Sequence, residues 1–446
     1  MMKQPQPYTH NVSWLATVSV LLLLVLITAC GDSGGGTTEP ITLADVNGQV
    51  WQDDNDNGLR DAGEDALEGV RVYWDRNENG AFDSGEPNRL TTADGRYSFR
   101  FEAGTYRLAI EPPSGSLQTL PRAGESLTSG STSRTANKVI DNKVIGGEVS
   151  SVDEFPFAAA LVPASAANAR VNIFCTASLV RPQWLITAAH CLLDGNGEPI
   201  TDVAGVEAVL GRTTLLSEAG ERIPASELIF FPNFVNRFNP FWLNDVMLIR
   251  LERPSSQATV RLLSPPLSNL ADVGTTATMA GWGNTNLRLD SGDPEELAND
   301  LQAALQPIDD LPECIRILDL ILEQSPTETA RPDLDPAAVL CSGFATPTNN
   351  PDFASSSAGD SGGPLLVQDA GDSYYLAGVT SFGADTSYDF RAYIPSYADW
   401  IETTIGERDP GHYTLTVADN ALDNINFGIR TANIVDDPSG LAFVAR

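Results

Sequence analysis

Apolar and polar residues alternate with a period of two in several short segments of the chain. The pattern runs over 70–74, 97–101 and 106–110, and it returns near the end of the chain over 412–417. Such alternation is typical of β-strands that turn one face to a core and the other to solvent. The pattern therefore predicts a mainly β protein with a β-sandwich near its N-terminus.

The first residues follow a different pattern, a continuous apolar run from Trp14 to Ala29 after a single basic residue, Lys3. At about 16 residues the run is short for a transmembrane span. The small residues before Cys30 resemble the lipobox of bacterial lipoproteins, in which the cysteine becomes the lipidated N-terminus. We expect residues 1–30 to be a lipoprotein signal peptide, with an uncleaved membrane anchor as the alternative.

Length and charge narrow the class of protein. At 446 residues the chain exceeds what one core normally holds, which predicts two or three domains. The formal net charge is −32, from 59 acidic and 27 basic residues, and this argues against nucleic acid as a partner. The Gly, Ser and Thr residues of 31–40 predict a flexible tether after the signal peptide.

Three separate segments carry the side chains that activate a nucleophilic hydroxyl. Ser361 lies in GDSGGP, His190 lies in TAAHC, and Asp245 stands directly before the apolar run VMLIRL. A serine needs an imidazole to take its proton, a carboxylate to orient that imidazole, and N–H donors for the oxyanion. Of the other two histidines, His10 falls in the predicted signal peptide and His412 in a predicted strand.

These motifs, in the order His, Asp, Ser, resemble the trypsin/chymotrypsin family of serine proteases. The resemblance implies a double six-stranded β-barrel over 144–404 and an endopeptidase that acts on protein or peptide substrates without a catalytic cofactor. It also implies that Gly359 and Ser361 supply the oxyanion hole. The alternative is a catalytically silent surface protein that uses the fold for adhesion or as a stalk.

The same resemblance implies activation by cleavage and two disulfides. An activating protease would cut after Lys143, and the freed Val144 ammonium would insert beside Asp360. The implied disulfides join Cys175 to Cys191 and Cys314 to Cys341. Five cysteines leave one unpaired, which lipidation of Cys30 explains. Two disulfides predict an oxidising compartment, so the enzyme should act outside the cytoplasm. With lipid on Cys30, it should be anchored at the bacterial outer membrane or cell surface.

The residues of the specificity pocket leave the substrate preference open. Ser355 stands where trypsin-like members carry an acid, and Ser381, Phe382 and Gly383 should form one wall. Asp389 should lie near the pocket floor. It either restores affinity for a basic side chain at P1, the substrate residue before the scissile bond, or is an ordinary surface carboxylate.

Two acidic segments, 53–64 and 75–86, fit the twelve-position calcium loop with its glycine at position 6. Solvated acidic turns without metal are the alternative. Because the flanks alternate with period two, 41–111 resembles the SdrD B-like domain of bacterial surface proteins, an Ig-like β-sandwich that binds structural Ca²⁺. The predicted ligands are Asp53, Asn55, Asn57, Leu59, Asp61, Glu64, Asp75, Asn77, Asn79, Ala81, Asp83 and Glu86.

The closing strand of that domain is missing directly after 41–111. Residues 112–143 are polar and predict a linker or propeptide, whereas an Asn-Phe-Gly ending occurs at 426–428. We therefore expect 412–430 to complete the sandwich, so that the protease is inserted into it. The alternative is a small independent tail, which could hardly bury a core alone.

Overall fold

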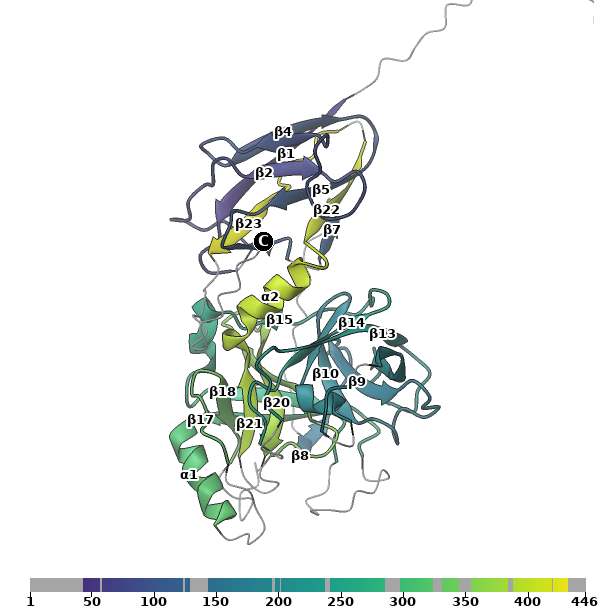
Figure 1. Ribbon diagram of the computed structural model, residues 1–446, viewed down its shortest axis with the longest axis vertical. Coiled ribbons are helices and arrows are strands. Elements are labelled where there is room, and N and C mark those ends of the chain that lie inside the picture. The colour runs from purple at the N-terminus through teal and green to yellow at the C-terminus, as the bar shows by residue number, and fades with distance from the viewer. Residues whose placement is uncertain are drawn as a thin grey trace, which may run out of the picture. The chain divides into compact units, whose positions relative to one another are not determined.

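The structure is a computed structural model (Figure 1). It describes residues 43–56, 58–122, 125–128, 143–194, 197–200, 202–236, 241–284, 297–323, 331–344, 354–383, 388–418 and 420–431, with the backbone alone over 143–148. The predicted signal peptide, Cys30, the tether at 31–40 and Asn57 lie outside the described residues. Within these ranges, no helix is both long and apolar enough to cross a membrane.

A β-sandwich forms from both ends of the described chain (Figure 1). Its four-stranded sheet has the order β4 (Arg96–Phe101), β1 (Ala44–Gln52), β23 (Phe427–Thr431), β6 (Ser116–Leu120). Its five-stranded sheet has the order β3 (Asn88–Leu90), β2 (Arg71–Trp74), β5 (Gly104–Glu111), β22 (His412–Val417), β7 (Ser126–Thr128).

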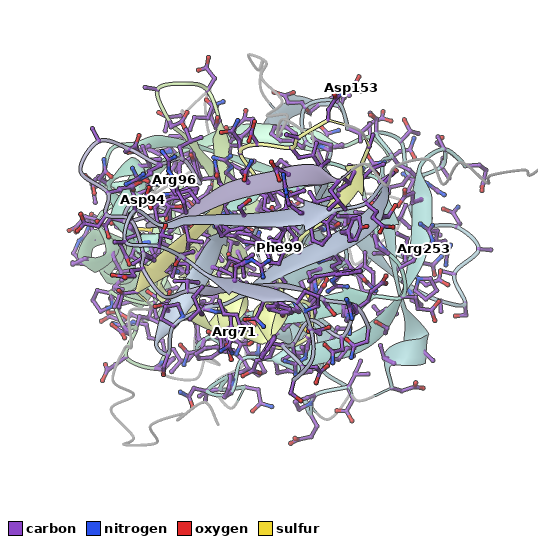
Figure 2. The ribbon with its side chains drawn as sticks, turned by 90° about the horizontal axis from the view of Figure 1, so that it is seen from above. Arg71, Asp94, Arg96, Phe99, Asp153 and Arg253 are labelled. Carbon is purple, nitrogen blue, oxygen red and sulfur yellow. A yellow bond between two sulfur atoms is a disulfide. The ribbon has the colours of Figure 1, made fainter. Side chains whose placement is uncertain are left out.

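The alternating segments bury their apolar faces in the sandwich core. In β4, Tyr97, Phe99 and Phe101 are buried and the residues between them are exposed. Figure 2 shows Phe99 among the strands of the sandwich, whereas Asp94 and Arg96 lie at its periphery, where they form an exposed ion pair. Burial of one large apolar side chain contributes about 1.5–3 kcal/mol, so the alternation accounts for the folding of these strands.

The C-terminal strands occupy central positions in both sheets. Strand β22 pairs antiparallel with β5, with Tyr413 opposite Leu108, and parallel with β7. Strand β23 pairs parallel with β1, with Phe427 opposite Val50, and antiparallel with β6. Segments on either side of the protease sequence therefore share one core.

The prediction that 112–143 is entirely a linker is wrong at β6 and β7. Both strands are short and polar, and of β6 only Thr119 is buried. They pair with β23 and β22, which come about 300 residues later in the chain. The local sequence therefore lacks the apolar pattern by which a strand is recognised, because these edge strands depend on partners that are remote in sequence.

Two closed six-stranded barrels follow, which confirms the predicted chymotrypsin-like fold. The first consists of β9 (Ala158–Pro163), β10 (Cys175–Arg181), β11 (Trp184–Thr187), β12 (Val206–Leu210), β13 (Glu221–Phe230) and β14 (Met247–Leu251). The second consists of β16 (Thr276–Gly281), β17 (Gln302–Asp309), β18 (Val339–Ser342), β19 (Pro364–Gln368), β20 (Tyr374–Gly383) and β21 (Asp389–Tyr393).

The remaining elements attach to these barrels. Strands β8 (Lys143–Val149) and β15 (Arg261–Leu262) pair with β17 and β20. Two α-helices are α1 (Leu311–Leu322) and α2 (Ala398–Gly406), and α2 extends past the predicted boundary at 404. The 3₁₀ turns are η1 (Ala189–Leu192), η2 (Val203–Gly205), η3 (Pro265–Ala271) and η5 (Ile394–Ser396).

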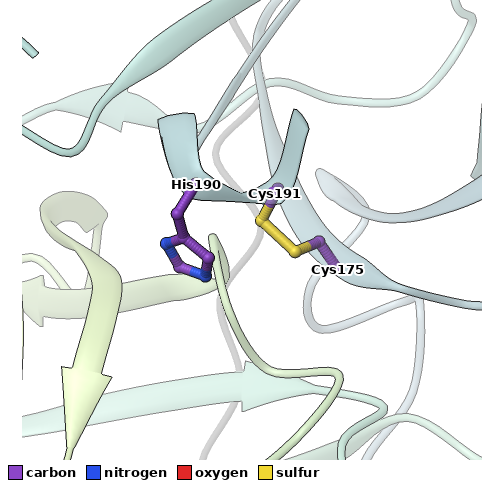
Figure 3. Close-up of side chains that lie close together, drawn as sticks. All are labelled: Cys175, His190 and Cys191. Carbon is purple, nitrogen blue, oxygen red and sulfur yellow. A yellow bond between two sulfur atoms is a disulfide. The ribbon is translucent and has the colours of Figure 1, made fainter. Parts of the chain in front are cut away.

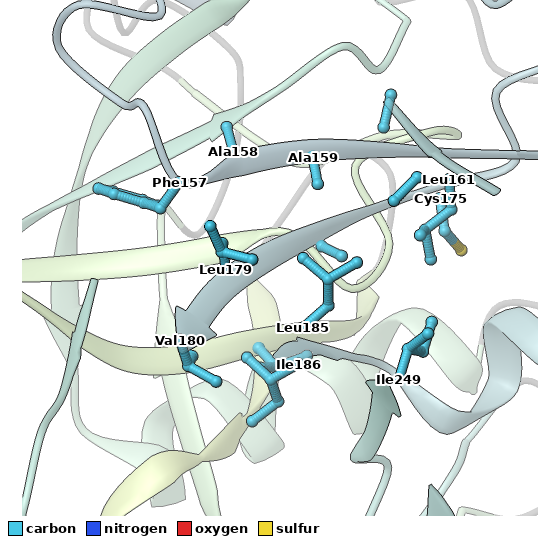
Figure 4. Packing of buried hydrophobic residues seen from close by; sticks show 14 of the residues in the cluster. Phe157, Ala158, Ala159, Leu161, Cys175, Leu179, Val180, Leu185, Ile186 and Ile249 are labelled. Carbon is cyan, nitrogen blue, oxygen red and sulfur yellow. The ribbon is translucent and has the colours of Figure 1, made fainter. Parts of the chain in front are cut away.

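The first barrel is rigid where it approaches the candidate site. All seven residues of β10 are buried, and Leu179, Leu185 and Ile249 pack in its interior (Figure 4). Both predicted disulfides are present and are confirmed: Cys175–Cys191 joins β10 to η1, and Cys314–Cys341 joins α1 to β18. A disulfide and a filled core thus hold the segment that carries His190.

Buried ion pairs link the sandwich to α2. Arg122, just after β6, lies 2.9 Å from Asp56 Oδ1 and 3.7 Å from Glu402 Oε1 on α2. Arg430 on β23 contacts Asp399 of the same helix at 2.6 Å. The side chains of this cluster are largely buried, so removal of one partner would leave a costly uncompensated charge.

Candidate active site

His190 and Asp245 lie together at the end of the first barrel. His190 belongs to η1, directly after β11, and Asp245 precedes β14. Asn244 has a φ of 53°, a left-handed conformation that Asn tolerates well, and this turn leads into Asp245. Asp245 thus lies in a short turn that ends at β14, and the barrel strands on either side hold it and His190 close together.

Asp245 holds His190 through one hydrogen bond to its backbone and one to its imidazole. Asp245 Oδ1 accepts from the His190 backbone N–H at 2.8 Å, and Oδ2 lies 2.6 Å from His190 Nδ1. Asp245 is buried, and the Ser381 hydroxyl also donates to Oδ2 at 2.5 Å. Because an ionised carboxylate only accepts, the proton between them is on Nδ1, and Nε2 is left as a proton acceptor.

Trp242 also contacts the imidazole. Its ring stacks on that of His190 with centroids 4.1 Å apart and an interplanar angle of 9°. The sequence prediction missed this residue because a single aromatic three positions before Asp245 follows no pattern. Stacking restricts the rotation of the His190 ring and covers one of its faces.

The turn that carries Ser361 packs against the segment before His190. The Ser361 carbonyl accepts from Thr176 N at 2.8 Å. Gly362 has a φ of +77°, and a Cβ there would lie 2.9 Å from Ala188 N. Only glycine permits this approach. Among the described residues no hydrogen bond joins the Ser361 hydroxyl to His190, and such contacts are often long in unliganded enzymes.

Asp360, beside Ser361, is a buried carboxylate. Its Oδ1 accepts from Gly283 N at 2.8 Å, and its Oδ2 accepts from Ser357 N at 3.1 Å. Burial raises the pKa of Asp360 to about 7, although both hydrogen bonds act in the opposite direction. Nearby Asp389 also raises this pKa, and Arg391 lowers it. Among the described side chains, which exclude those of Lys143 and Val144 in β8, no ion pair with Asp360 occurs.

The predicted pocket residues are brought together in the second barrel. Asp389 is fully buried, which rules out the alternative of a surface carboxylate, and Ser355 Oγ donates to it at 3.3 Å. Gly383 is opposite Asp389 in the sheet, and a Cβ there would lie 2.7 Å from Asp389 Oδ1. Phe382 is buried and stacks on Phe390 at 4.9 Å. Ser381 lines a small cavity beside Phe382 and also hydrogen-bonds to Asp245.

Asp389 has three neighbours that the sequence prediction missed. Ser356 donates from its N–H at 2.9 Å and from its hydroxyl at 2.6 Å, and Gln306 donates at 2.6 Å. Arg391 forms a buried ion pair with Asp389 at 3.1 Å. The one available signal was Arg391, a basic residue among the otherwise uncharged residues 390–393.

The second predicted calcium loop turns its first and last acids inward. Glu86 is buried, and its two carboxylate oxygens accept from Arg76 N at 2.7 Å and from Asp83 N at 3.1 Å. Asp75 is buried and accepts from Gly80 N at 2.9 Å, where Gly80 has a φ of +76°.

The first loop repeats this arrangement. Glu64 accepts from Asp54 N at 3.1 Å and from Asp61 N at 2.8 Å, and the buried Asp53 accepts from Gly58 N at 2.9 Å. The other described ligand candidates are exposed or half-buried: Asn55, Leu59, Asp61, Asn77, Asn79, Ala81 and Asp83. A buried acid at each end, with carbonyl, carboxylate and amide oxygens between, suits Ca²⁺.

One further cluster has the residue types of a metal site but cannot act as one. Cys175, His190 and Cys191 lie close together (Figure 3). The two sulfurs are joined to each other in a disulfide and offer no thiolate.

Two six-stranded barrels and a His–Asp pair, with a serine in the turn 359–364, are the features of the chymotrypsin-like class of serine proteases. The model of the trypsin family matches residues 144–315 and 337–401, more than half of the chain, and the protein belongs to this family. The model of the SdrD B-like domain matches residues 44–153.

Individual relatives agree with this assignment. The chain is 29% identical over 240 residues to a trypsin of Saccharopolyspora erythraea, which covers 54% of this chain and 86% of the relative. It is 28% identical over 275 residues to the anionic trypsin of Canis lupus familiaris, and the match spans 59% of this chain and 90% of that trypsin. It is also 28% identical to the CLIP domain-containing serine protease B4 of Anopheles gambiae, and the match spans 60% of this chain and 71% of that protease.

Proposed function

We propose that this member of the trypsin family is an active endopeptidase that uses Ser361, His190 and Asp245. The observation that carries the proposal is the pair of hydrogen bonds from His190 to Asp245, which fix one tautomer and one orientation of the imidazole. His190 takes the Ser361 proton as the hydroxyl attacks the peptide carbonyl, and then passes it to the leaving amine.

The Ser361 turn would supply the electrostatic part of catalysis. The N–H groups of Gly359 and Ser361 would bind the oxyanion of the tetrahedral intermediate, and loss of such a donor costs about 10²–10³-fold in rate. The positive φ of Gly359, +98°, favours a glycine at this position.

The protein is made, in this proposal, as a zymogen. Asp360 is buried with a raised pKa, and no described side chain forms an ion pair with it. Cleavage after Lys143 by an activating protease would free the Val144 ammonium, whose insertion beside Asp360 gives that carboxylate a counter-charge. The turn that contains Gly359 and Ser361 would then be held in its active form.

The sandwich would be a calcium-dependent anchor. Asp53 and Glu64 in one loop and Asp75 and Glu86 in the other would hold Ca²⁺, which stabilises the loops by neutralising their acids. With a lipid on Cys30, the sandwich would attach the enzyme to a membrane outside the cytoplasm.

Covalent labelling of the nucleophile tests the catalytic proposal. The full chain is cleaved with immobilised trypsin, the trypsin is removed, and a fluorophosphonate that reacts with activated serines is added. We expect one label per chain at Ser361, with none on Ser361→Ala and none on trypsin-treated Lys143→Gln. A chain whose new N-terminus is Val144 and which still takes no label would favour the silent adhesion or stalk protein.

A further inference from the structure

The acid of the specificity pocket is already fully engaged by the protein. Both oxygens of Asp389 accept hydrogen bonds, Oδ1 from the hydroxyls of Ser355 and Ser356, and Oδ2 from Gln306, the Ser356 N–H and Arg391. A carboxylate offers about four lone-pair positions in total. Little capacity therefore remains for a substrate group.

The cation of this pair is equally well held. Arg391 is buried, and its guanidinium donates to Ser342 at 2.9 Å, to Gln306 Oε1 at 2.7 Å, to Thr380 and to Asp389. These partners lie on β18, β17, β20 and β21. The pair is thus part of the barrel framework and does not depend on the conformation of a surface loop.

Net charge decides which substrate side chain such a floor attracts. An unpaired buried carboxylate favours a cation strongly, because the low dielectric strengthens the attraction. Here Arg391 balances Asp389 at 3.1 Å, both side chains are fully buried, and Ser355 and Ser356 are uncharged. A lysine or arginine at P1 would lose its hydration on binding and would find no unpaired carboxylate to form an ion pair with.

We infer that Arg391 is a specificity-determining residue: it neutralises Asp389, so that the pocket accepts uncharged P1 side chains in preference to lysine or arginine. Phe382 is buried and apolar, and Gly383 lies opposite Asp389 in the sheet, where it leaves no side chain over the carboxylate. The inference rests on the proposed protease function, since P1 is a property of a cleaved substrate.

The cleaved wild-type enzyme gives the first test. We expect kcat/KM for peptides with Phe or Leu at P1 to exceed that for matched peptides with Lys or Arg by at least about tenfold. A preference for Lys or Arg would overturn the inference, whereas hydrolysis of none of these peptides would count against the proposed function instead.

A charge cycle assigns the effect to Arg391. Arg391→Gln should raise the Lys-to-Phe ratio of kcat/KM by at least about tenfold, because Asp389 is then unbalanced. Asp389→Asn should lower the ratio, and the double variant should return it close to wild type. Arg253→Gln, which removes an exposed charge, should leave it unchanged. A purely structural role would lower both rates together with an unchanged ratio, and that outcome would refute the inference.

Binding gives a readout that needs no catalysis. In cleaved Ser361→Ala protein, benzamidine, an aromatic cation, should bind no more tightly than the uncharged benzamide. The additional substitution Arg391→Gln should make benzamidine the tighter ligand. Tight benzamidine binding with Arg391 intact would contradict the inference even if the protein hydrolysed no peptide.

Discussion

Two buried carboxylates near the candidate site differ in how their charge is balanced. Asp389 lies at the start of β21 and forms an ion pair with Arg391, whose other partners lie on neighbouring strands. Asp360 lies in the turn beside Ser361 and accepts hydrogen bonds from two backbone N–H groups. No described side chain forms an ion pair with it, and Arg391 acts on it only through a weaker electrostatic attraction. If the two proposals hold, Asp389 contributes to a fixed property of the pocket, whereas Asp360 gains its counter-charge only after cleavage.

Loss of Asp360 should have the largest effect on the activated enzyme. Asp360→Asn cannot form an ion pair with the Val144 ammonium, so the oxyanion donors would not be ordered. We expect kcat/KM of the cleaved protein to fall by about 10²–10³-fold for every P1 residue. Asp389→Asn should instead change the ranking of P1 residues. Equal activity of Asp360→Asn and wild type would remove the distinction between the two acids.

Before cleavage, the lack of an ion pair at Asp360 should make the stability of the protein depend on pH. The pKa of Asp360 is raised from 3.8 to about 7, so folded protein keeps a proton that unfolded protein has lost. The stabilisation is present below about pH 4 and is lost as pH rises through 7, a change on the order of 4 kcal/mol.

Denaturant unfolding of wild type and Asp360→Asn at pH 4 and pH 8 measures this change. From pH 4 to pH 8 the unfolding free energy of wild type should fall more than that of Asp360→Asn. A difference that does not vary with pH would mean that the carboxylate is already balanced before cleavage.

The acids of the sandwich should respond to metal rather than to cleavage. Chelation should lower the melting temperature of the sandwich by several degrees, as expected when a ligand of the folded state is removed. Glu64→Gln with Glu86→Gln should abolish the response, and Glu111→Gln, an exposed acid of β5, should preserve it. Calorimetry with no calcium-dependent transition would exclude this role.

The smallest expected effect is on attachment after cleavage. Because β22 and β23 pair with strands of the N-terminal part, cleavage after Lys143 should leave the protease bound to the sandwich. Lipidated protein is cleaved, its membranes are washed with or without chelator, and both fractions are assayed. Free protease in the calcium-containing wash, with no second cut, would contradict the predicted tether.

Sequence reasoning succeeded where the determining signal is local. Motifs fixed by chemistry predicted the contact between His190 and Asp245, which the structure contains, and period-two alternation predicted the strands that bury aromatic residues. It failed where partners are remote: β6 and β7 form against strands about 300 residues away. The pairing of Asp389 with Arg391 depends on which face of the barrel each side chain occupies, and the stacking of Trp242 on His190 depends on how a loop folds back. No short pattern encodes these arrangements.

The central positions of β22 and β23 have a consequence for biosynthesis. Each lies between two strands that are translated before the protease, β5 and β7 in one sheet and β1 and β6 in the other. Until β22 and β23 have been synthesised, one strand is missing from the interior of each sheet. The unpaired edges of the neighbouring strands are then exposed to other chains. A chain truncated after α2 would keep the strands of both barrels and lack β22 and β23, so the sandwich would stay incomplete.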